Sequence, residues 1–480
     1  MTCSTRSLST CCAALVAVLS DRTFLPGTQG YDESLSSYYS QQEQLLRPGC
    51  FVKPSTAAET SLAMYTMSVA INEALLTGED PCSFAIRSGG HGGPASSNIA
   101  DEVTIDLRGL GTIDVEGDVV SVQAGCTWDQ VYARLDPLRL SVAGGRNAGV
   151  GVGGLTTGGG ISFFSPRYGW ACDTLLNVEV VLANGSIVNA NSDENEDLLR
   201  AIRGGSNNFG IVTRFDFQAF EQDGLWGGLS YYSLSTIDEH LDTLVEFSNP
   251  DTYDEYSSLI TSFVLKTGVP PLLATNLEYT KPVEYPPSLK RITAIPSLSS
   301  TLRLANMTEL SVELASTQSY GLRQLSVEIT LATNVAILKT VFLRWQDTLS
   351  AIQLAASVDT WAISLEPLPP AIYQRRSESN SLGLEDRSQS LMILLLSAAW
   401  ADTEDDTLVE QTARSMFLDI EIEAKRLGVY DPFVYLNYAA PWQDPFASYG
   451  VASRKRLQEV RQRYDPRQIF SFNVPGGFDI

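Results

Sequence analysis

Residues 144–160 read GGRNAGVGVGGLTTGGG, and nine of these seventeen residues are glycine. Each glycine in an ordered segment costs roughly 0.5–1 kcal/mol relative to alanine, because glycine loses the most backbone entropy on folding. Close approach of backbone N–H groups to a large anionic or planar ligand explains such a density. Tight turns at a domain junction are the structural alternative. The glycine density favours a ligand-binding loop, and we expect the fold to be built around it.

Part of this loop matches a dinucleotide fingerprint. Gly149, Gly151 and Gly154 satisfy G-x-G-x-x-G, and Asp173 follows nineteen residues later. In a Rossmann fold such a loop opens a helix whose N-terminus holds the pyrophosphate. The continuation TGGGISFFSP (157–166) is not expected to be helical. An NAD(P)-dependent dehydrogenase is therefore the second hypothesis.

A second glycine-rich segment surrounds a histidine. Residues 85–93 read AIRSGGHGG, a strand pattern that runs into a loop. Arg87, the Ser88 hydroxyl and successive loop amides suit a pyrophosphate. His91 has small neighbours that leave it free to approach a ring system, although a loop histidine is more often a turn residue. Since the chain has only two histidines, the other being His240, a functional role for His91 is favoured.

Composition excludes several classes of function. A formal charge of −23 disfavours nucleic acid and anionic membranes as partners, and no apolar run reaches the ~20 residues that span a bilayer. Two histidines and the lack of CxxC spacing argue against a metal site. At 480 residues, two or three lobes are expected.

The seven cysteines are crowded toward the N-terminus, at positions 3, 11, 12, 50, 82, 126 and 172. This crowding indicates one or two disulfides, with scattered buried thiols as the alternative, and Cys126 and Cys172 are expected to be structural. Two glycosylation sequons, at Asn184 and Asn306, add a slight preference for the secretory pathway. Residues 12–19 are interpreted as the first helix of the folded domain rather than a signal peptide.

Hydrophobic periodicity divides the chain into segments of different character. The first part is predicted to be α+β, and its expected helices are 57–76, 128–135 and 197–202. Its expected strands are 83–87, 103–107, 119–123, 140–143, 175–182, 187–189 and 211–217, with a hairpin at Asn184-Gly185. The second part, from about 221 to 430, is predicted to hold strands 256–265, 324–332 and 391–398, helices 237–247, 335–354 and 407–427, and turns at 281–287 and 367–370. The last part holds a strand near 431, a helix at 453–464 and a glycine-rich tail.

Several motifs in one order resemble the FAD-linked oxidases of the vanillyl-alcohol-oxidase superfamily. The similarity is to the berberine-bridge-enzyme-like branch, especially its fungal members. The motifs are AIRSGGH (85–91), VTIDL (103–107), VQAGCTWDQVY (122–132), VGVGGLTTGGG (150–160), YGWACDTLLNVEVVLANGSIVNA (168–190), LLRAIRGGSNNFGIVTRF (198–215), YLNY (435–438) and VPGGF (474–478). The resemblance is clear over 48–220 and 431–480 and diffuse between them.

The resemblance implies a two-lobed FAD-binding domain with an inserted α+β substrate domain that has an antiparallel sheet. The implied limits are 1–47 for an N-terminal helical segment, 48–220 for the FAD-binding domain, 221–430 for the substrate-binding domain and 431–480 for the return to the FAD domain. His91 would form an 8α bond to FAD. The position of a second, cysteinyl link in some members is Asn147 here, so one covalent bond is expected.

The resemblance also assigns the other cofactor contacts. Residues 87–90 would contact the pyrophosphate, residues 150–160 would line the cofactor, and residues 210–212 would hold the adenine side. The predicted cofactor residues are Arg87, Ser88, Gly89, Gly90, His91, Gly92, Val150, Gly151, Gly154, Leu155, Gly158, Gly159, Gly160, Gly210, Ile211, Val212, Tyr435 and Asn437. No metal is expected.

Tyr438, the last residue of YLNY, is implied as the catalytic base, with Tyr435 and Asn437 seating the ring. A phenol with an ordinary pKa of about 10 is a poor base at neutral pH, so the site must lower that pKa. A buried structural tyrosine is the alternative. Ala439-Ala440-Pro441 follow where relatives often have an aspartate, which leaves the hydrogen-bond network of the base open.

These residues predict an FAD-dependent oxidase that transfers hydride from a small organic substrate to covalent flavin, with dioxygen as electron acceptor. A tailoring step in fungal secondary metabolism is the favoured role. An oligosaccharide oxidase, a non-redox cyclase or ligand-binding scaffold, and the NAD(P)-dependent dehydrogenase are the alternatives.

Overall fold

The helix expected at 57–76 opens the first lobe. In the computed structural model, which describes residues 8–355 and 357–480, it is α4 (Ala57–Thr77). The Thr56 side chain accepts a hydrogen bond from the Glu59 N–H at its start, and Gly78 ends it at φ +76°, where glycine is favoured. The capping residues therefore set both ends as the sequence predicts.

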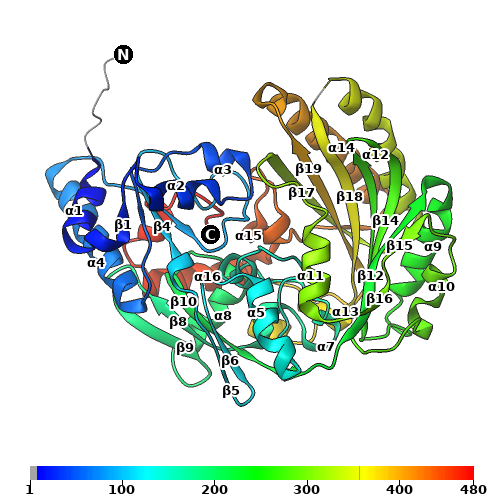
Figure 1. Cartoon of the computed structure of the whole chain (residues 1–480), viewed down its shortest axis with the longest axis horizontal. Helices are drawn as coiled ribbons and strands as arrows, with labels where there is room; N and C mark the ends of the chain where they lie inside the picture. The colour runs from blue at the N-terminus through cyan, green and yellow to red at the C-terminus, as the bar shows by residue number, and fades with distance from the viewer. Residues whose placement is uncertain (1–7, 356) are drawn as a thin grey trace.

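Two sheets form the first lobe, on the left in Figure 1. One has the order β1-β2-β4-β3, and its strands β2, β4 and β3 are parallel. The other has the antiparallel order β5-β6-β10-β8-β9. The strands are β1 (Thr23–Phe24), β2 (Cys50–Val52), β3 (Phe84–Arg87), β4 (Val103–Asp106), β5 (Ile113–Glu116), β6 (Val119–Gln123), β8 (Leu175–Val181), β9 (Ile187–Asn191) and β10 (Ile211–Gln218). The hairpin predicted at Asn184-Gly185 joins β8 and β9.

Helices pack around these sheets. They are α1 (Thr10–Val18), α2 (Gln29–Ser36), α3 (Gln41–Leu45), α5 (Trp128–Leu135) and α8 (Glu196–Gly205). The prediction of one or two disulfides is confirmed, because Cys11 bonds Cys82 and Cys12 bonds Cys50. Both bonds tie α1 to the first sheet, so residues 12–19 are part of the folded lobe. Cys126 and Cys172 are buried free thiols, and Cys3 lies outside the described residues.

A short helix lies within the glycine-rich loop, contrary to expectation. The helix α6 (Val152–Thr157) begins after Gly151 and ends where Gly158 caps it. Residues 158–164 are not helical, as predicted. The next helix is α7 (Ser165–Tyr168), which Pro166 helps to start. The preceding strand, β7 (Leu140–Ser141), is shorter than predicted, and in the described chain its partner is β11 (Phe220–Glu221). The loop therefore lacks the parallel βαβ setting of a Rossmann fingerprint.

The second lobe is built on one antiparallel sheet of nine strands, on the right in Figure 1. Its order is β15-β12-β14-β13-β18-β19-β17-β20, and β16 also pairs with β12. The strands are β12 (Leu225–Ser233), β13 (Ser257–Lys266), β14 (Val269–Tyr279), β15 (Ser299–Ser300), β16 (Arg303–Ala305), β17 (Arg323–Ala332), β18 (Val358–Leu368), β19 (Leu391–Trp400) and β20 (Tyr430–Asp431).

Strand alternation divides the residues of this sheet between two faces. On one face, Phe263 of β13 packs against Phe342 and Trp345, and helices on that side cover a second apolar core. The helices of this lobe are α9 (Ile237–Phe247), α10 (Lys290–Thr293), α11 (Met307–Ala315), α12 (Val335–Ala355), α13 (Pro370–Tyr373) and α14 (Asp406–Leu427). The other face is turned toward the first lobe.

Five strands of this sheet, β12, β14, β15, β16 and β18, were not predicted, and the turn expected at 367–370 is partly wrong. Pro367 and Leu368 are the end of β18. In the described chain β18 pairs with β13 as far as Leu365 and beyond it with β19 alone. Pro367 fits there because one side of the strand no longer needs an N–H donor.

The C-terminal segment returns to the first lobe, as the red elements of Figure 1 show. Its helices are the 3₁₀ turn Leu436–Tyr438, α15 (Pro445–Ser448), α16 (Gly450–Tyr464) and α17 (Ile469–Phe472). The fold is thus α+β as predicted, with two sheets in the first lobe and an antiparallel sheet in the second lobe, which is inserted before the C-terminal return. We propose 1–47, 48–220, 221–430 and 431–480 as its divisions. No helix in the described chain is long and apolar enough to cross a membrane.

Candidate functional site

The two glycine-rich loops of the sequence lie back to back in the structure. The Ser88 hydroxyl donates to the Ala124 carbonyl at 2.6 Å and accepts from the Gly153 N–H at 3.1 Å. A Cβ atom on Gly89 would lie 2.5 Å from the Gly151 nitrogen, and one on Gly151 would lie 2.2 Å from the Gly89 nitrogen. At Gly89 and Gly151 the two backbones touch directly, which explains why both positions need glycine.

The histidine loop presents a row of free N–H donors. Among the described residues, none accepts a hydrogen bond from the N–H of Gly89, Gly90, His91 or Gly92. Gly90 has φ +73°, so the chain turns within this row. Successive unpaired amides in a turn form an anion-binding surface. Next to them Gly154 is exposed, with open space where a side chain would be. This side-chain-free surface fits a bound pyrophosphate.

The Arg87 side chain binds neighbouring residues of the protein. Its guanidinium is fully buried, donates to the Ser34 carbonyl at 2.5 Å and the Ser37 hydroxyl at 2.9 Å, and stacks 3.6 Å from the Tyr38 ring centre. Asp106 lies 4.0 Å away. Backbone amides rather than this guanidinium are thus placed for an anion.

His91 is enclosed by side chains from two parts of the chain. Its ring stacks on Tyr39 with centroids 3.9 Å apart and planes 9° apart, and Tyr320 lies edge-on at 5.8 Å. Its Nε2 lies 3.2 Å from the Gln318 Oε1. Burial lowers the pKa of His91 to about 4, so the imidazole is neutral at physiological pH.

The YLNY motif holds the glycine-rich loop in place. The Tyr435 hydroxyl accepts from the Gly160 N–H at 3.0 Å and from the Asn437 side chain at 2.9 Å. Asn437 also donates to the Leu155 carbonyl at 2.9 Å. A Cβ atom on Gly158 would lie 2.1 Å from the Asn437 oxygen, so this glycine is required sterically.

The remaining predicted cofactor residues are backbone elements. The Val150 carbonyl accepts from the Trp128 N–H at 3.1 Å, and Gly159 has φ +113°. Gly210 precedes β10, in which Ile211 and Val212 pair with β8 and are buried. Their predicted place beside the adenine stays a prediction.

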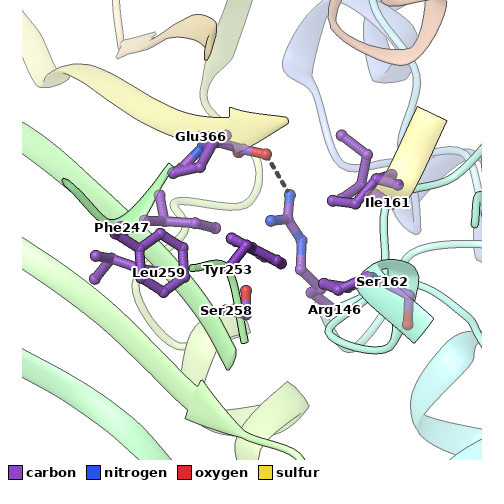
Figure 2. A pocket seen from close by; sticks show the side chains of 12 residues that line it. Arg146, Ile161, Ser162, Phe247, Tyr253, Ser258, Leu259 and Glu366 are labelled. Carbon is purple, nitrogen blue, oxygen red and sulfur yellow. Dashed lines mark hydrogen bonds and ion pairs between the residues drawn. The ribbon is translucent and has the colours of Figure 1, made fainter. Parts of the chain in front are cut away.

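Tyr438 belongs to a buried cluster with Arg146 and Glu366, and Figure 2 shows the bond between the latter two. The Tyr438 hydroxyl accepts from Arg146 Nη2 at 2.6 Å and donates to the Glu366 carboxylate at 3.1 Å. Arg146 Nη2 also donates to Glu366 at 2.9 Å. Arg146 therefore places a cation beside the Tyr438 phenol, as a lowered pKa of that phenol would require. Nevertheless, burial raises the pKa of Tyr438 well above its usual value, Arg146 lowers it and Glu366 raises it again.

Strand register brings Glu366 to this cluster. Ser262 of β13 pairs with Ser364 of β18, so Ser364 and Glu366 lie on the sheet face opposite Phe263. Glu366 contacts Arg146 of the first lobe beside a cavity of about 20 Å3, which has room for one or two waters. The cavity is lined by Arg146, Ile161, Ser162, Pro166, Phe247, Tyr253, Ser258, Leu259, Ile260, Glu366, Pro367 and Ile372.

Sequence reasoning missed three side chains at these sites. Arg146 is the only charged residue in 144–160. A single charge in a glycine-rich loop indicates a candidate site residue. Glu366 could have been found from strand alternation had β18 been recognised. Gln318 lies in a polar loop without periodicity, so no sequence pattern marks it.

Comparison with known proteins identifies the family. Residues 72–191 match a family model described as an FAD binding domain. The FAD-dependent monooxygenase sdcF of Emericella nidulans is 35% identical over 480 residues, covering 98% of both chains. The chain belongs to the same family of FAD-linked oxidoreductases as this fungal monooxygenase. The NAD(P)-dependent alternative is therefore wrong.

Another relative of this FAD-linked oxidoreductase is much longer. The protein called oligopeptidase PhomG' of Diaporthe leptostromiformis is 39% identical over 470 residues, which cover 97% of this chain. The chain spans only 37% of the length of that relative.

Solved structures agree on the fold. The 6-hydroxy-D-nicotine oxidase of Arthrobacter nicotinovorans has a TM-score of 0.77 at 20% identity, covering 93% of this chain and 96% of its own. Glucooligosaccharide oxidase of Acremonium strictum has a TM-score of 0.77 at 18% identity, covering 98% and 100%. That glucooligosaccharide oxidase carries a 6-S-cysteinyl, 8α-N1-histidyl FAD.

Proposed function

We propose that this FAD-linked oxidoreductase carries FAD bonded to His91 and oxidises a small organic molecule, with dioxygen as the final electron acceptor. The observation that carries the proposal is a neutral, half-buried imidazole within a row of free amides. The amides of residues 89–92 would hold the pyrophosphate and the loop 150–160 would line the cofactor. The histidyl link in the glucooligosaccharide oxidase supports the same bond here.

A single covalent bond is proposed, because Asn147 carries no thiol for a second one. The Asn147 side-chain oxygen is buried and lacks a hydrogen-bond partner among the described residues. An unpaired buried carbonyl of this kind is costly unless a bound group satisfies it. This orphaned acceptor is consistent with a cofactor beside the glycine-rich loop.

When bound, the flavin supplies an acceptor for hydride from a substrate carbon. The protein must then remove a proton from the substrate hydroxyl. Tyr438 would take that proton on its hydroxyl oxygen while its own proton passes to Glu366, along the 3.1 Å bond. Arg146 contacts both oxygens and offsets the negative charge of the pair. The base is thus a Tyr438–Glu366 pair rather than Tyr438 alone.

The apolar side chains around this small cavity, rather than the cavity itself, support an aromatic or aliphatic substrate over a sugar. Phe247, Leu259, Ile260 and Ile372 give apolar surface, and the polar groups gather around the single ion pair. The fungal monooxygenase relatives support a tailoring step in secondary metabolism. An oligosaccharide oxidase, suggested by the structural neighbours, and a non-redox cyclase are the remaining alternatives.

The test is flavin fluorescence on a denaturing gel after acid precipitation, with His91→Ala alongside. A fluorescent wild-type band that is absent in His91→Ala supports the bond. Yellow supernatant over a colourless precipitate would keep the flavin and reject the link to His91. A protein without any flavin would reject the proposal. Reduction of bound flavin by a ligand then separates an oxidase from a cyclase.

A further inference from the structure

Gln318 reaches His91 from the second lobe. It lies in the loop 316–322 between α11 and β17, which is fixed at both ends. The Gly321 N–H donates to the Tyr39 carbonyl at 2.9 Å, and the Gln41 N–H donates to the Leu322 carbonyl at 2.8 Å. On the sheet side, Lys266 donates to the Thr317 carbonyl at 3.1 Å. The Gln318 side chain is therefore held at His91 by a docked loop.

The hydrogen bond between these residues selects one tautomer of the imidazole. The Gln318 atom at 3.2 Å from His91 Nε2 is the amide oxygen, which can only accept. A neutral ring that donates to Gln318 carries its proton on Nε2, and Nδ1 then carries the unshared electron pair. Stacking on Tyr39 fixes the plane of the ring and hence the direction of that pair.

We propose that Gln318 is a positioning residue for flavin attachment, which holds the Nε2 proton of His91 so that Nδ1 bonds the 8α carbon. The inference rests on the covalent link proposed above and adds the residue that directs it. It also couples the two lobes, because the residue that orients His91 belongs to the second lobe.

The reaction balances with dioxygen as oxidant. A bond forms between Nδ1 and the 8α carbon, one C–H bond of the methyl group breaks, and the imidazole finally loses its Nε2 proton. Two electrons from this exchange reduce the flavin, and dioxygen accepts them to give hydrogen peroxide. While Nδ1 is bonded and Nε2 still carries its proton, the ring is positively charged. The Gln318 oxygen and the Tyr39 ring face stabilise that charge.

The test compares Gln318→Leu, which lacks the acceptor, with Gln318→Glu, which keeps one. Flavin-free protein from riboflavin-starved cells is incubated with FAD, and covalent attachment is followed by intact mass. Acid-released FAD measures the bound, unattached fraction. Thr317→Ala, an exposed neighbour in the same loop, is the matched control. Gln318→Met, unbranched and without a carbonyl oxygen, replaces the leucine variant if that variant does not fold.

We expect Gln318→Leu to attach flavin at least about tenfold more slowly than wild type, with unchanged Tm and total FAD. Gln318→Glu and Thr317→Ala should attach at near wild-type rates. NMR of the flavin peptide should find the Nδ1 bond alone in wild type and a fraction of Nε2-linked product in the leucine variant. A purely structural role would not change which nitrogen is bonded.

Two results would overturn the inference separately from the proposed function. If wild type is covalently linked and Gln318→Leu attaches as fast through Nδ1, Gln318 does not direct the bond. If Gln318→Glu fails as badly as Gln318→Leu, the residue acts through packing rather than as an acceptor. A wild type without any covalent flavin would instead reject the His91 link itself.

Discussion

The two walls of the candidate site are built in opposite ways. The wall from the first lobe consists of backbone: the two loops touch directly at Gly89 and Gly151 and leave amides free. The wall from the second lobe consists of side chains, such as Glu366, which project from one face of a nine-stranded sheet. A backbone surface can bind a cofactor common to a whole family, whereas side chains on a sheet can change without altering the fold.

The first prediction tests the backbone wall and carries the largest expected effect. In Gly151→Ala a Cβ atom would lie 2.2 Å from the Gly89 nitrogen, so the two loops must separate. We expect little soluble protein, or protein with less than about a tenth of the wild-type FAD, as measured by absorbance after denaturation. Gly111→Ala is the control, because that glycine is exposed with open space around it. Normal flavin content in Gly151→Ala would show that the loops are not tightly joined.

The second prediction tests the side-chain wall. Glu366→Gln keeps the shape of the side chain but removes the proton acceptor of Tyr438. We expect full FAD content and a reductive rate about 100-fold or more below wild type. The measurement is anaerobic bleaching of the flavin in a stopped-flow instrument, with a substrate found by screening phenols and aromatic alcohols. An unchanged rate would exclude Glu366 from proton removal.

The third prediction separates Tyr438 from its carboxylate partner. Tyr438→Phe leaves Glu366 paired with Arg146, so a water in the cavity could carry the proton. We expect a loss of about tenfold, smaller than for Glu366→Gln, in the same bleaching assay. A larger loss in Tyr438→Phe would instead make the phenol the principal base.

The fourth prediction concerns stability, and its effect is the smallest. Burial raises the pKa of Glu328, on the same sheet, to about 8. Because the folded pKa lies above the ordinary 4.5, the protonated folded form is favoured. Its contribution to stability is full below about pH 4.5 and is lost as the pH rises through about 8. Glu328→Gln should flatten the fall in Tm between pH 5 and about 8.5 relative to wild type.

Calorimetry at several pH values measures this effect, with the exposed Glu404→Gln as control. Some slope will persist in Glu328→Gln, because burial also raises the pKa of Glu43 to about 7 and of Asp173 to about 6. Parallel curves for wild type and Glu328→Gln would mean that Glu328 is ionised in the folded protein.

Much of the fold could be predicted because its signals are local. The helices α5 and α9 match their predicted limits, since the apolar spacing of each lies within the segment itself, and α5 also has a capping box. The strand β12 was missed because Gly227-Gly228 interrupts its pattern, and β14 because Pro270-Pro271 stands near its start. In both strands the pairing with neighbours outweighs local propensity.

The need for glycine in the two loops of the first lobe could be predicted from the amino acids alone. A glycine tolerates no substitute where backbones touch, so that requirement is visible directly in residues such as Gly89 and Gly151. The partners of the reactive side chains, in contrast, depend on the folded arrangement of the chain. Arg146, Glu366 and Tyr438 are far apart in sequence, and strand register and lobe docking bring them together. The same holds for Gln318 and His91, whose contact depends on a loop that docks across the two lobes.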